Sequence, residues 1–278
     1  MLTLLQISDL HFGPPYLPEV GEAVLRIAPT LAPDAVVVCG DLTQRAKREQ
    51  FVQARAFLDR LPPVPLVVVP GNHDVPLWRV LERWRDPHGL FRKYINDELD
   101  HVQRLDGAVL VALNSTAPRS AISNGRIHPG QLEFCSNAFR AAPENAARIV
   151  VAHHHFAPAP DYERDQTMPR AKRAMNRFVD LGVDLVLGGH LHRAYIGNSL
   201  DVFPGSHRDR GVIIVHCGTT TSARGRGRER EKNSLNVITI DDDSFRVTHY
   251  MHFHKYKGFR PVSRHAFPRS GTHFDDTE

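Results

Sequence analysis

The sequence contains little cysteine. Among 278 residues there are three, Cys39, Cys135 and Cys217. An odd and widely spaced set does not fit the paired disulfide framework of small secreted proteins. Cys39 and Cys217 lie in apolar runs, and Cys135 lies in a helix-like pattern. The scarcity of cysteine argues against a fold built on disulfides and favours a reducing, cytoplasmic environment.

Long hydrophobic runs are missing as well. No apolar stretch reaches the roughly 20 residues that a helix needs to span a bilayer. The amino-terminal stretch from Met1 to Ile7 has no basic region, and its apolar run is too short for a secretory signal. We therefore expect a cytoplasmic protein without a membrane span.

Neither sign of charge dominates. Thirty-five Lys and Arg oppose 31 Asp and Glu, which gives a net charge of +4 and a pI near 9.1. This mild excess favours an anionic partner but falls short of the basic stripe of nucleic-acid-binding proteins. A small anionic substrate is the favoured partner, nucleic acid is less favoured, and an oligomer is compatible with the pattern.

What the chain does have is 17 histidines, together with apolar runs that stop abruptly at polar residues. Strands are expected at 2–7, 35–39, 66–69, 148–152 and 185–187, with helices between them. This alternation predicts an α/β fold with a largely parallel, layered sheet. The runs at 212–216, 235–240 and 245–250 read as antiparallel strands that close a second sheet. We expect one domain over residues 1–256 and an irregular tail over 257–278, which lacks a periodic apolar pattern.

Metal-type side chains follow most of these strands. They are Asp9, His11, Asp41, Asn72 with His73 and Asp74, the run His153-His154-His155, and His190 with His192. Any one of them could equally be a polar turn or a capping residue. Their recurrence at strand ends, where open α/β sheets bind ligands, favours a single site.

The chemistry of these groups favours two metal ions. Mixed carboxylate, amide and imidazole ligands suit Mn, Fe or Zn better than Ca or Mg. Two such ions about 3.5–4 Å apart can clamp the oxygens of a phosphoryl group and lower the pKa of a bound water.

In chain order, Asp9-Leu10-His11, Gly40-Asp41, Gly71-Asn72-His73-Asp74, the histidine run and Gly189-His190-Leu191-His192 resemble the motifs of calcineurin-like metallophosphoesterases. The resemblance covers about residues 2 to 220. It implies a four-layer αββα sandwich of two mixed β-sheets flanked by helices. Within the family, the sequence is most similar to bacterial class III cyclic-nucleotide phosphodiesterases.

The resemblance also implies roles for the residues. Asp9, His11 and His192 would bind the first metal, and Asp41 would bridge both metals. Asn72, His190 and one histidine of the triple run would bind the second metal. His73 would lie near the leaving-group oxygen as the catalytic histidine, positioned by Asp74.

The ligand within the triple histidine is open between two residues. Family members usually have a proline two residues after this ligand, and Phe156 occupies the corresponding position here. This alignment indicates His154 and leaves His153 as the alternative. If strand alternation continued, His153 and His155 would point away from the side that His154 faces.

The function expected from this set is metal-dependent hydrolysis of a small phosphodiester by an activated water or hydroxide. Two further enzyme readings are a pyrophosphatase for a nucleotide-linked lipid precursor and a nuclease. The first would need an apolar trough, and the apolar residues of 77–99 are interrupted by Arg and Asp. The second would need a basic groove with stacking aromatics, whereas Glu229 and Glu231 offset the arginines of the loop 222–230. A scaffold without catalysis is disfavoured because every ligand position is filled.

Overall fold

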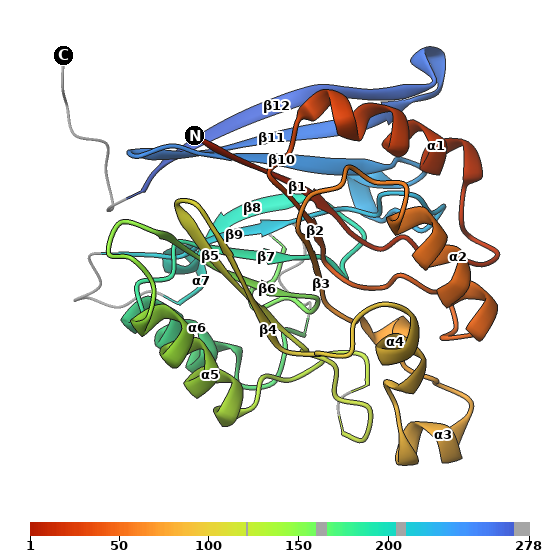
Figure 1. Cartoon of the computed structure of the whole chain (residues 1–278), viewed down its shortest axis with the longest axis horizontal. Coiled ribbons are helices and arrows are strands. Elements are labelled where there is room, and N and C mark those ends of the chain that lie inside the picture. Colours follow the sequence, from red (N-terminus) through yellow and green to blue (C-terminus); the bar gives the residue numbers. More distant parts are fainter. Residues whose placement is uncertain (121, 160–165, 204–209, 270–278) are drawn as a thin grey trace.

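The computed structural model describes residues 1–120, 122–159, 166–203 and 210–269. Their strands form two six-stranded sheets that lie face to face (Figure 1). In spatial order, the first sheet contains β12 (Gly258–Pro268), β11 (Ser244–Phe253), β10 (Ser234–Ile240), β1 (Leu2–Ile7), β2 (Ala35–Val38) and β3 (Leu66–Val68). The second contains β4 (His101–Leu105), β5 (Ala108–Leu113), β6 (Ala147–Ala152), β7 (Leu185–Gly188), β9 (Ile213–His216) and β8 (Tyr195–Asn198).

Both sheets are mixed. β1, β2 and β3 run parallel, and β10 joins β1 in the antiparallel direction. In the second sheet β5, β6, β7 and β9 run parallel, with β4 and β8 as antiparallel edge strands. The parallel strands β2 and β5 consist of Val, Leu and Ala and are buried along their whole length, as is typical of a parallel strand between two layers.

Helices pack on the outer faces of the sheets or extend beyond them (Figure 1). They are α1 (Pro18–Ile27), α2 (Arg48–Leu58), α3 (Val80–Arg85), α4 (Gly89–Tyr94), α5 (Pro129–Arg140), α6 (Ala171–Asp180) and α7 (Ser199–Val202). One apolar cluster packs α1 and α2 on the first sheet, and another packs α5 and α6 on the second. A third fills the space between the sheets. The predicted αββα sandwich is therefore confirmed.

Two details of the sequence prediction are wrong. The run 212–216 forms β9, which pairs in parallel with β7, and β10 and β11 extend the first sheet instead of closing the second. β9 is buried throughout, which is typical of a parallel strand, but the pattern of one strand does not specify its neighbour.

The predicted irregular tail is also wrong over Gly258–Pro268, which forms the edge strand β12 paired with β11. Its outer face lies in solvent, so arginines and histidines replace the apolar alternation that would have marked it. Residues 270–278 of that predicted tail lie outside the described residues. No helix among the described residues is long and apolar enough to cross a membrane.

Candidate metal centre

The predicted ligands converge where β1, β2 and β3 of one sheet and β6 and β7 of the other reach their carboxyl ends. The backbone there is unusual. Ten non-glycine residues of the described chain have positive φ, and five of them are predicted ligands. This left-handed region is sterically costly for residues with a Cβ and is concentrated at functional sites. The five residues are Asp9 (φ 53°), His11 (52°), Asp41 (52°), His190 (74°) and His192 (53°).

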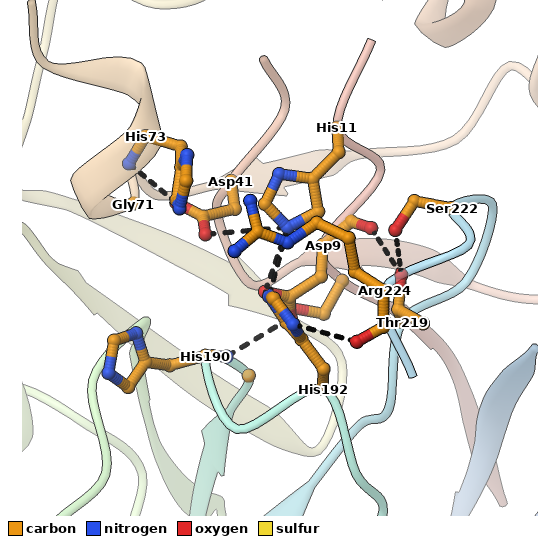
Figure 2. Close-up of polar contacts among 12 residues, drawn as sticks. Asp9, His11, Asp41, Gly71, His73, His190, His192, Thr219, Ser222 and Arg224 are labelled. Carbon is orange, nitrogen blue, oxygen red and sulfur yellow. Dashed lines mark hydrogen bonds and ion pairs between the residues drawn. The ribbon is translucent and has the colours of Figure 1, made fainter. Parts of the chain in front are cut away.

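Asp9, His11, Asp41 and His192 form a first buried cluster, with ligand atoms all within 4.8 Å of one another (Figure 2). His11 Nε2 lies 3.0 Å from His192 Nε2 and 3.6 Å from Asp41 Oδ2. His192 Nε2 lies 3.2 Å from Asp9 Oδ1. Two imidazole nitrogens and two carboxylate oxygens thus surround one point.

The oxygens at this point have unmet hydrogen-bonding capacity. Asp9 Oδ1 and Asp41 Oδ2 are buried and accept no hydrogen bond from the residues that the structure describes. A buried carboxylate oxygen without a partner is costly, and a cation removes that cost. The donor set of this cluster therefore fits a metal ion.

A second cluster adjoins the first through Asp41. His153, His154 and His190 have ring nitrogens within 4.8 Å of one another. The amide oxygen of Asn72 lies 3.2 Å from His153 Nε2 and 3.1 Å from His190 Nδ1. Asp41 Oδ1 lies 3.4 Å from His153 Nε2, while Oδ2 faces the first cluster. The two oxygens of this one carboxylate therefore face the two clusters separately.

The triple histidine does not continue the alternation of β6. The strand ends at Ala152 and the chain bends over 153–154, so all three side chains are buried beside His190. The expectation that His153 and His155 point away is wrong for this reason. His153 Nδ1 donates to the Cys39 carbonyl at 2.7 Å, which leaves Nε2 facing Asp41 and Asn72. His154 Nδ1 contacts Ser115 Oγ at 2.8 Å, and its buried Nε2 has no hydrogen-bond partner.

His73 lies next to the first cluster, with its ring edge-on to His11 at a centroid distance of 4.9 Å. Its Nδ1 donates to the carbonyl oxygen of Gln44 at 2.9 Å. The prediction that Asp74 positions this ring is wrong. Asp74 instead accepts hydrogen bonds from the backbone amides of Gly71, Leu42 and Thr43 and from the Thr43 hydroxyl. Asp74 therefore holds the 41–43 and 71–74 loops together.

Two glycines allow these loops to approach closely. A Cβ on Gly71 would collide with the Asp41 carboxylate, and a Cβ on Gly189 would collide with Ser8 Oγ and the Asp9 carboxylate. Glycine is required here for space, independently of its φ angle.

The carboxylates are strongly acidic in this environment. Burial by itself would raise the pKa of Asp9, but His192 and His11 hold it well below its usual value. Burial also opposes ionisation of Asp41, whose pKa is held well below its usual value by His153 and His73. Burial lowers the pKa of His11 to about 4, whereas Asp41 overcomes the burial of His153 and raises its pKa to about 9. The two ionised carboxylates, Asp9 and Asp41, therefore place negative charge in a buried site, where cations must balance it.

Sequence reasoning gave no role to the loop from Thr219 to Arg224, which encloses the first cluster. Thr219 Oγ1 donates to the Asp9 carbonyl at 2.8 Å, and Thr221 Oγ1 donates to the Leu10 carbonyl at 2.9 Å. The carbonyl of Arg224 accepts from His192 Nδ1 at 3.1 Å, which orients that ring. The Thr- and Arg-rich composition of this loop was the one feature of the sequence that could have indicated its role.

The Arg224 guanidinium extends toward the first cluster, beside His11 (Figure 2). It donates to Gln44 Oε1 at 3.0 Å. Burial lowers the pKa of Arg224, and the nearby Asp41 and Asp9 oppose this shift. A half-buried cation thus adds to the positive charge available at the site.

Comparison with known proteins shows the same architecture. The family model described as calcineurin-like phosphoesterase matches residues 2–194, more than half of the chain. A comparison with curated sequences yields no match.

Solved structures match at low sequence identity, which shows the shared fold alone. The purple acid phosphatase PPD1 from yellow lupin seeds has a TM-score of 0.74 at 12% identity over 97% of this chain, which spans only 54% of the lupin chain. A dimetal phosphatase from Danio rerio has a TM-score of 0.66 at 13% identity, over 97% of this chain and 99% of that one. GAP50, named as the anchor in the inner membrane complex of Plasmodium, has a TM-score of 0.62 at 13% identity, over 96% of this chain and 89% of its own.

Proposed function

The chain belongs to the calcineurin-like phosphoesterase family, and from this premise we propose that it is a dinuclear-metal phosphoesterase that hydrolyses a small phosphodiester. The observation that carries the proposal is Asp41, because its two oxygens face two separate groups of buried ligand atoms. The donor sets of both groups fit metal ions.

We assign the ligands as follows. Asp9, His11, Asp41 and His192 would hold the first ion. Asp41, Asn72, His190 and His153 would hold the second, with His153 preferred to His154 because its Nε2 faces both Asp41 and Asn72. The mixed oxygen and nitrogen donors suit Mn, Fe or Zn. Two such ions supply Lewis acidity to the phosphoryl oxygens and an acidified water as nucleophile.

The protein's own residues would orient the substrate and stabilise its charge. The Arg224 guanidinium lies where it can donate to a phosphoryl oxygen, and charge-assisted hydrogen bonds of this kind are among the strongest in proteins. His73 is held through Nδ1, so its Nε2 is the atom that can donate a proton to the departing oxygen or stabilise charge beside it.

The proposed diester preference rests on the motif resemblance to cyclic-nucleotide phosphodiesterases. The name of the Danio rerio neighbour supports two metals, and its description as a phosphatase keeps a monoester as the principal alternative. GAP50 is named as an anchor, but in this chain every proposed ligand position is filled, which favours catalysis.

One panel of substrates tests the proposal. Purified protein loaded with Mn²⁺ is assayed against cyclic nucleotides, nucleotide-sugar diesters, glycerophosphodiesters, a single-stranded oligonucleotide and phosphomonoesters. We expect the highest kcat/KM for a small diester. A preference for monoesters would overturn the diester assignment, and no hydrolysis of any substrate by protein with two bound metals would overturn the enzyme assignment.

A further inference from the structure

The short helix α3 exposes its apolar side chains to solvent. Trp78, two residues before it, is 78% exposed, and Leu81 and Trp84 are 82% and 60% exposed. With the half-exposed Val80, these residues form what we call the α3 patch. They include both tryptophans of the sequence. No residue of α3 is buried, so the helix contributes nothing to an apolar core.

Two arginines of this segment are hydrogen-bonded to backbone carbonyls, whereas Arg85 is exposed. Arg79 donates through Nη2 to the Ala46 carbonyl at 2.7 Å and pairs with Glu82. Arg83 donates through Nη1 to the Leu77 carbonyl at 2.6 Å. A surface helix of a soluble protein normally turns its apolar side inward. In this segment two arginines form hydrogen bonds with backbone carbonyls, while the tryptophan and leucine side chains are exposed to solvent.

Val80, Leu81 and Trp84 share one side of α3, because residues three and four apart are neighbours on a helix. Figure 1 shows α3 beyond α4, at the periphery of the molecule and away from both sheets. α4 is anchored to the body through Phe91, whose ring packs edge-on against Phe51 of α2. The α3 patch therefore lies on the outer side of α4, which is itself packed against the body of the protein.

Positive charge surrounds the patch. Between Trp78 and Tyr94 there are five basic and two acidic side chains. Both acidic groups are already paired within the segment, Glu82 with Arg79 and Asp86 with Arg92. The guanidinium of Arg119 also lies 5.7 Å from the centre of the Trp84 ring. Exposed tryptophan and leucine among arginines is the composition of segments that enter the headgroup region of anionic membranes.

We propose that the α3 patch docks onto the surface of an anionic lipid bilayer. Trp78, Leu81 and Trp84 would insert among the headgroups, and the exposed Arg85 of α3 would contact the lipid phosphates. Charge favours this partner over a second copy of the chain, because a symmetric dimer through the patch would bring two basic segments together. The proposal does not depend on the hydrolytic function.

Hydrogen bonds link the segment that carries the patch to the loop beside the metal centre. Arg79 binds the carbonyls of Arg45 and Ala46, and the preceding residue, Gln44, holds His73. The segment that carries the patch is therefore connected to the loop that holds His73.

The two tryptophans make the test direct, since all indole fluorescence of the protein arises from the patch. Full-length protein is titrated with vesicles of phosphatidylcholine alone or with about a third phosphatidylglycerol, and binding is followed by the blue shift of this fluorescence and by co-sedimentation. We expect binding to the anionic vesicles, weakened by salt, and little binding to the neutral ones.

Leu81→Asp should lower the partition coefficient by about tenfold or more and leave hydrolysis of a soluble substrate unchanged. The matched control is Val262→Asp, which alters an apolar residue 44% exposed on β12 and should bind as the wild type does. Absence of vesicle binding by the wild type, equal binding to both vesicle types, or equal loss in the two variants would each overturn the proposal. So would a lipid-free dimer in sedimentation equilibrium that Leu81→Asp dissociates, because the patch would then be a contact between copies.

Discussion

At the scale of the residue, the two oxygens of Asp41 have different surroundings. Oδ2 faces His11 and Oδ1 faces His153, so this one carboxylate joins the two ligand groups. Asp41→Asn removes the negative charge and replaces one of the two oxygens with an amide nitrogen. We expect loss of at least one metal per chain in elemental analysis and loss of hydrolysis. Retention of two tightly bound metals with the wild-type rate would contradict the bridging role.

The triple histidine gives the second test at this scale. His153 Nε2 faces Asn72 and Asp41, whereas His154 is held by Ser115. His153→Ala should therefore lower the metal content from two ions towards one, and His154→Ala should retain both. The comparison uses elemental analysis and calorimetric titration with Mn²⁺. The reverse result would restore the assignment to His154 that motif alignment favours.

His73 is expected to contribute to catalysis without binding metal. His73→Ala should keep both metals and its fold but lose rate on a diester with an alkyl leaving group, by roughly 10²–10⁴-fold. The loss on bis(p-nitrophenyl) phosphate should be much smaller, because an activated phenolate needs little help from a proton donor. Equal losses on the two substrates would leave His73 an electrostatic role only, and loss of metal would make it a ligand.

At the scale of the element, the loop from Thr219 to Arg224 encloses the first ligand cluster. Arg224→Ala should weaken competitive inhibition by orthophosphate and raise KM for the diester, each by about tenfold, because a charge-assisted contact to phosphate is lost. Metal content should not change, because the carbonyl that orients His192 belongs to the backbone.

Arg226→Ala is the matched control for Arg224→Ala, since Arg226 lies two residues after this loop and its side chain is exposed. It should leave inhibition by orthophosphate as it is in the wild type. An inhibition constant unaltered by Arg224→Ala would show that the guanidinium does not contact the phosphoryl group.

The elements also show how far sequence reasoning reaches. Abrupt stops after apolar runs located the strand ends, because buried parallel strands have a strong local pattern. The sequence analysis missed β12, because most side chains of this edge strand are exposed and its apolar residues do not alternate regularly. The contact between Arg224 and Gln44 joins residues 180 positions apart, and no local pattern encodes it. The orientation of His153 depended on a chain bend after Ala152 that spacing alone did not reveal.

At the scale of the whole molecule, a buried histidine that is not a proposed metal ligand couples folding to pH. His88 contacts Thr116 Oγ1 at 2.7 Å, and burial, with the nearby Arg92 and Arg119, lowers its pKa to about 4 against the partial opposition of Asp86. An unfolded chain would protonate this ring near pH 6.5. Between these two pKa values the ring is protonated in the unfolded state and neutral in the folded state. The free energy of unfolding therefore falls as the pH drops from 6.5 towards 4.

His88→Gln should reduce this pH dependence. The contribution of His88 to the free energy of unfolding between pH 7.5 and 5 is roughly 2 kcal/mol. Urea unfolding of metal-free protein at both pH values should show a smaller decrease for the variant than for the wild type. Identical decreases would mean that His88 is protonated as easily in the folded state as in the unfolded state.

The irregular backbone of β12 affects how readily copies of the protein associate at high concentration. The register of its pairing with β11 shifts beside Pro261, a residue that has no amide hydrogen to offer to a neighbouring strand. Exposed arginines at 260 and 264 flank this irregularity. β3, at the opposite edge of the same sheet, is three residues long. Within the described residues, the edges of the first sheet therefore offer no straight, apolar strand to which strands of other molecules could add and start to aggregate.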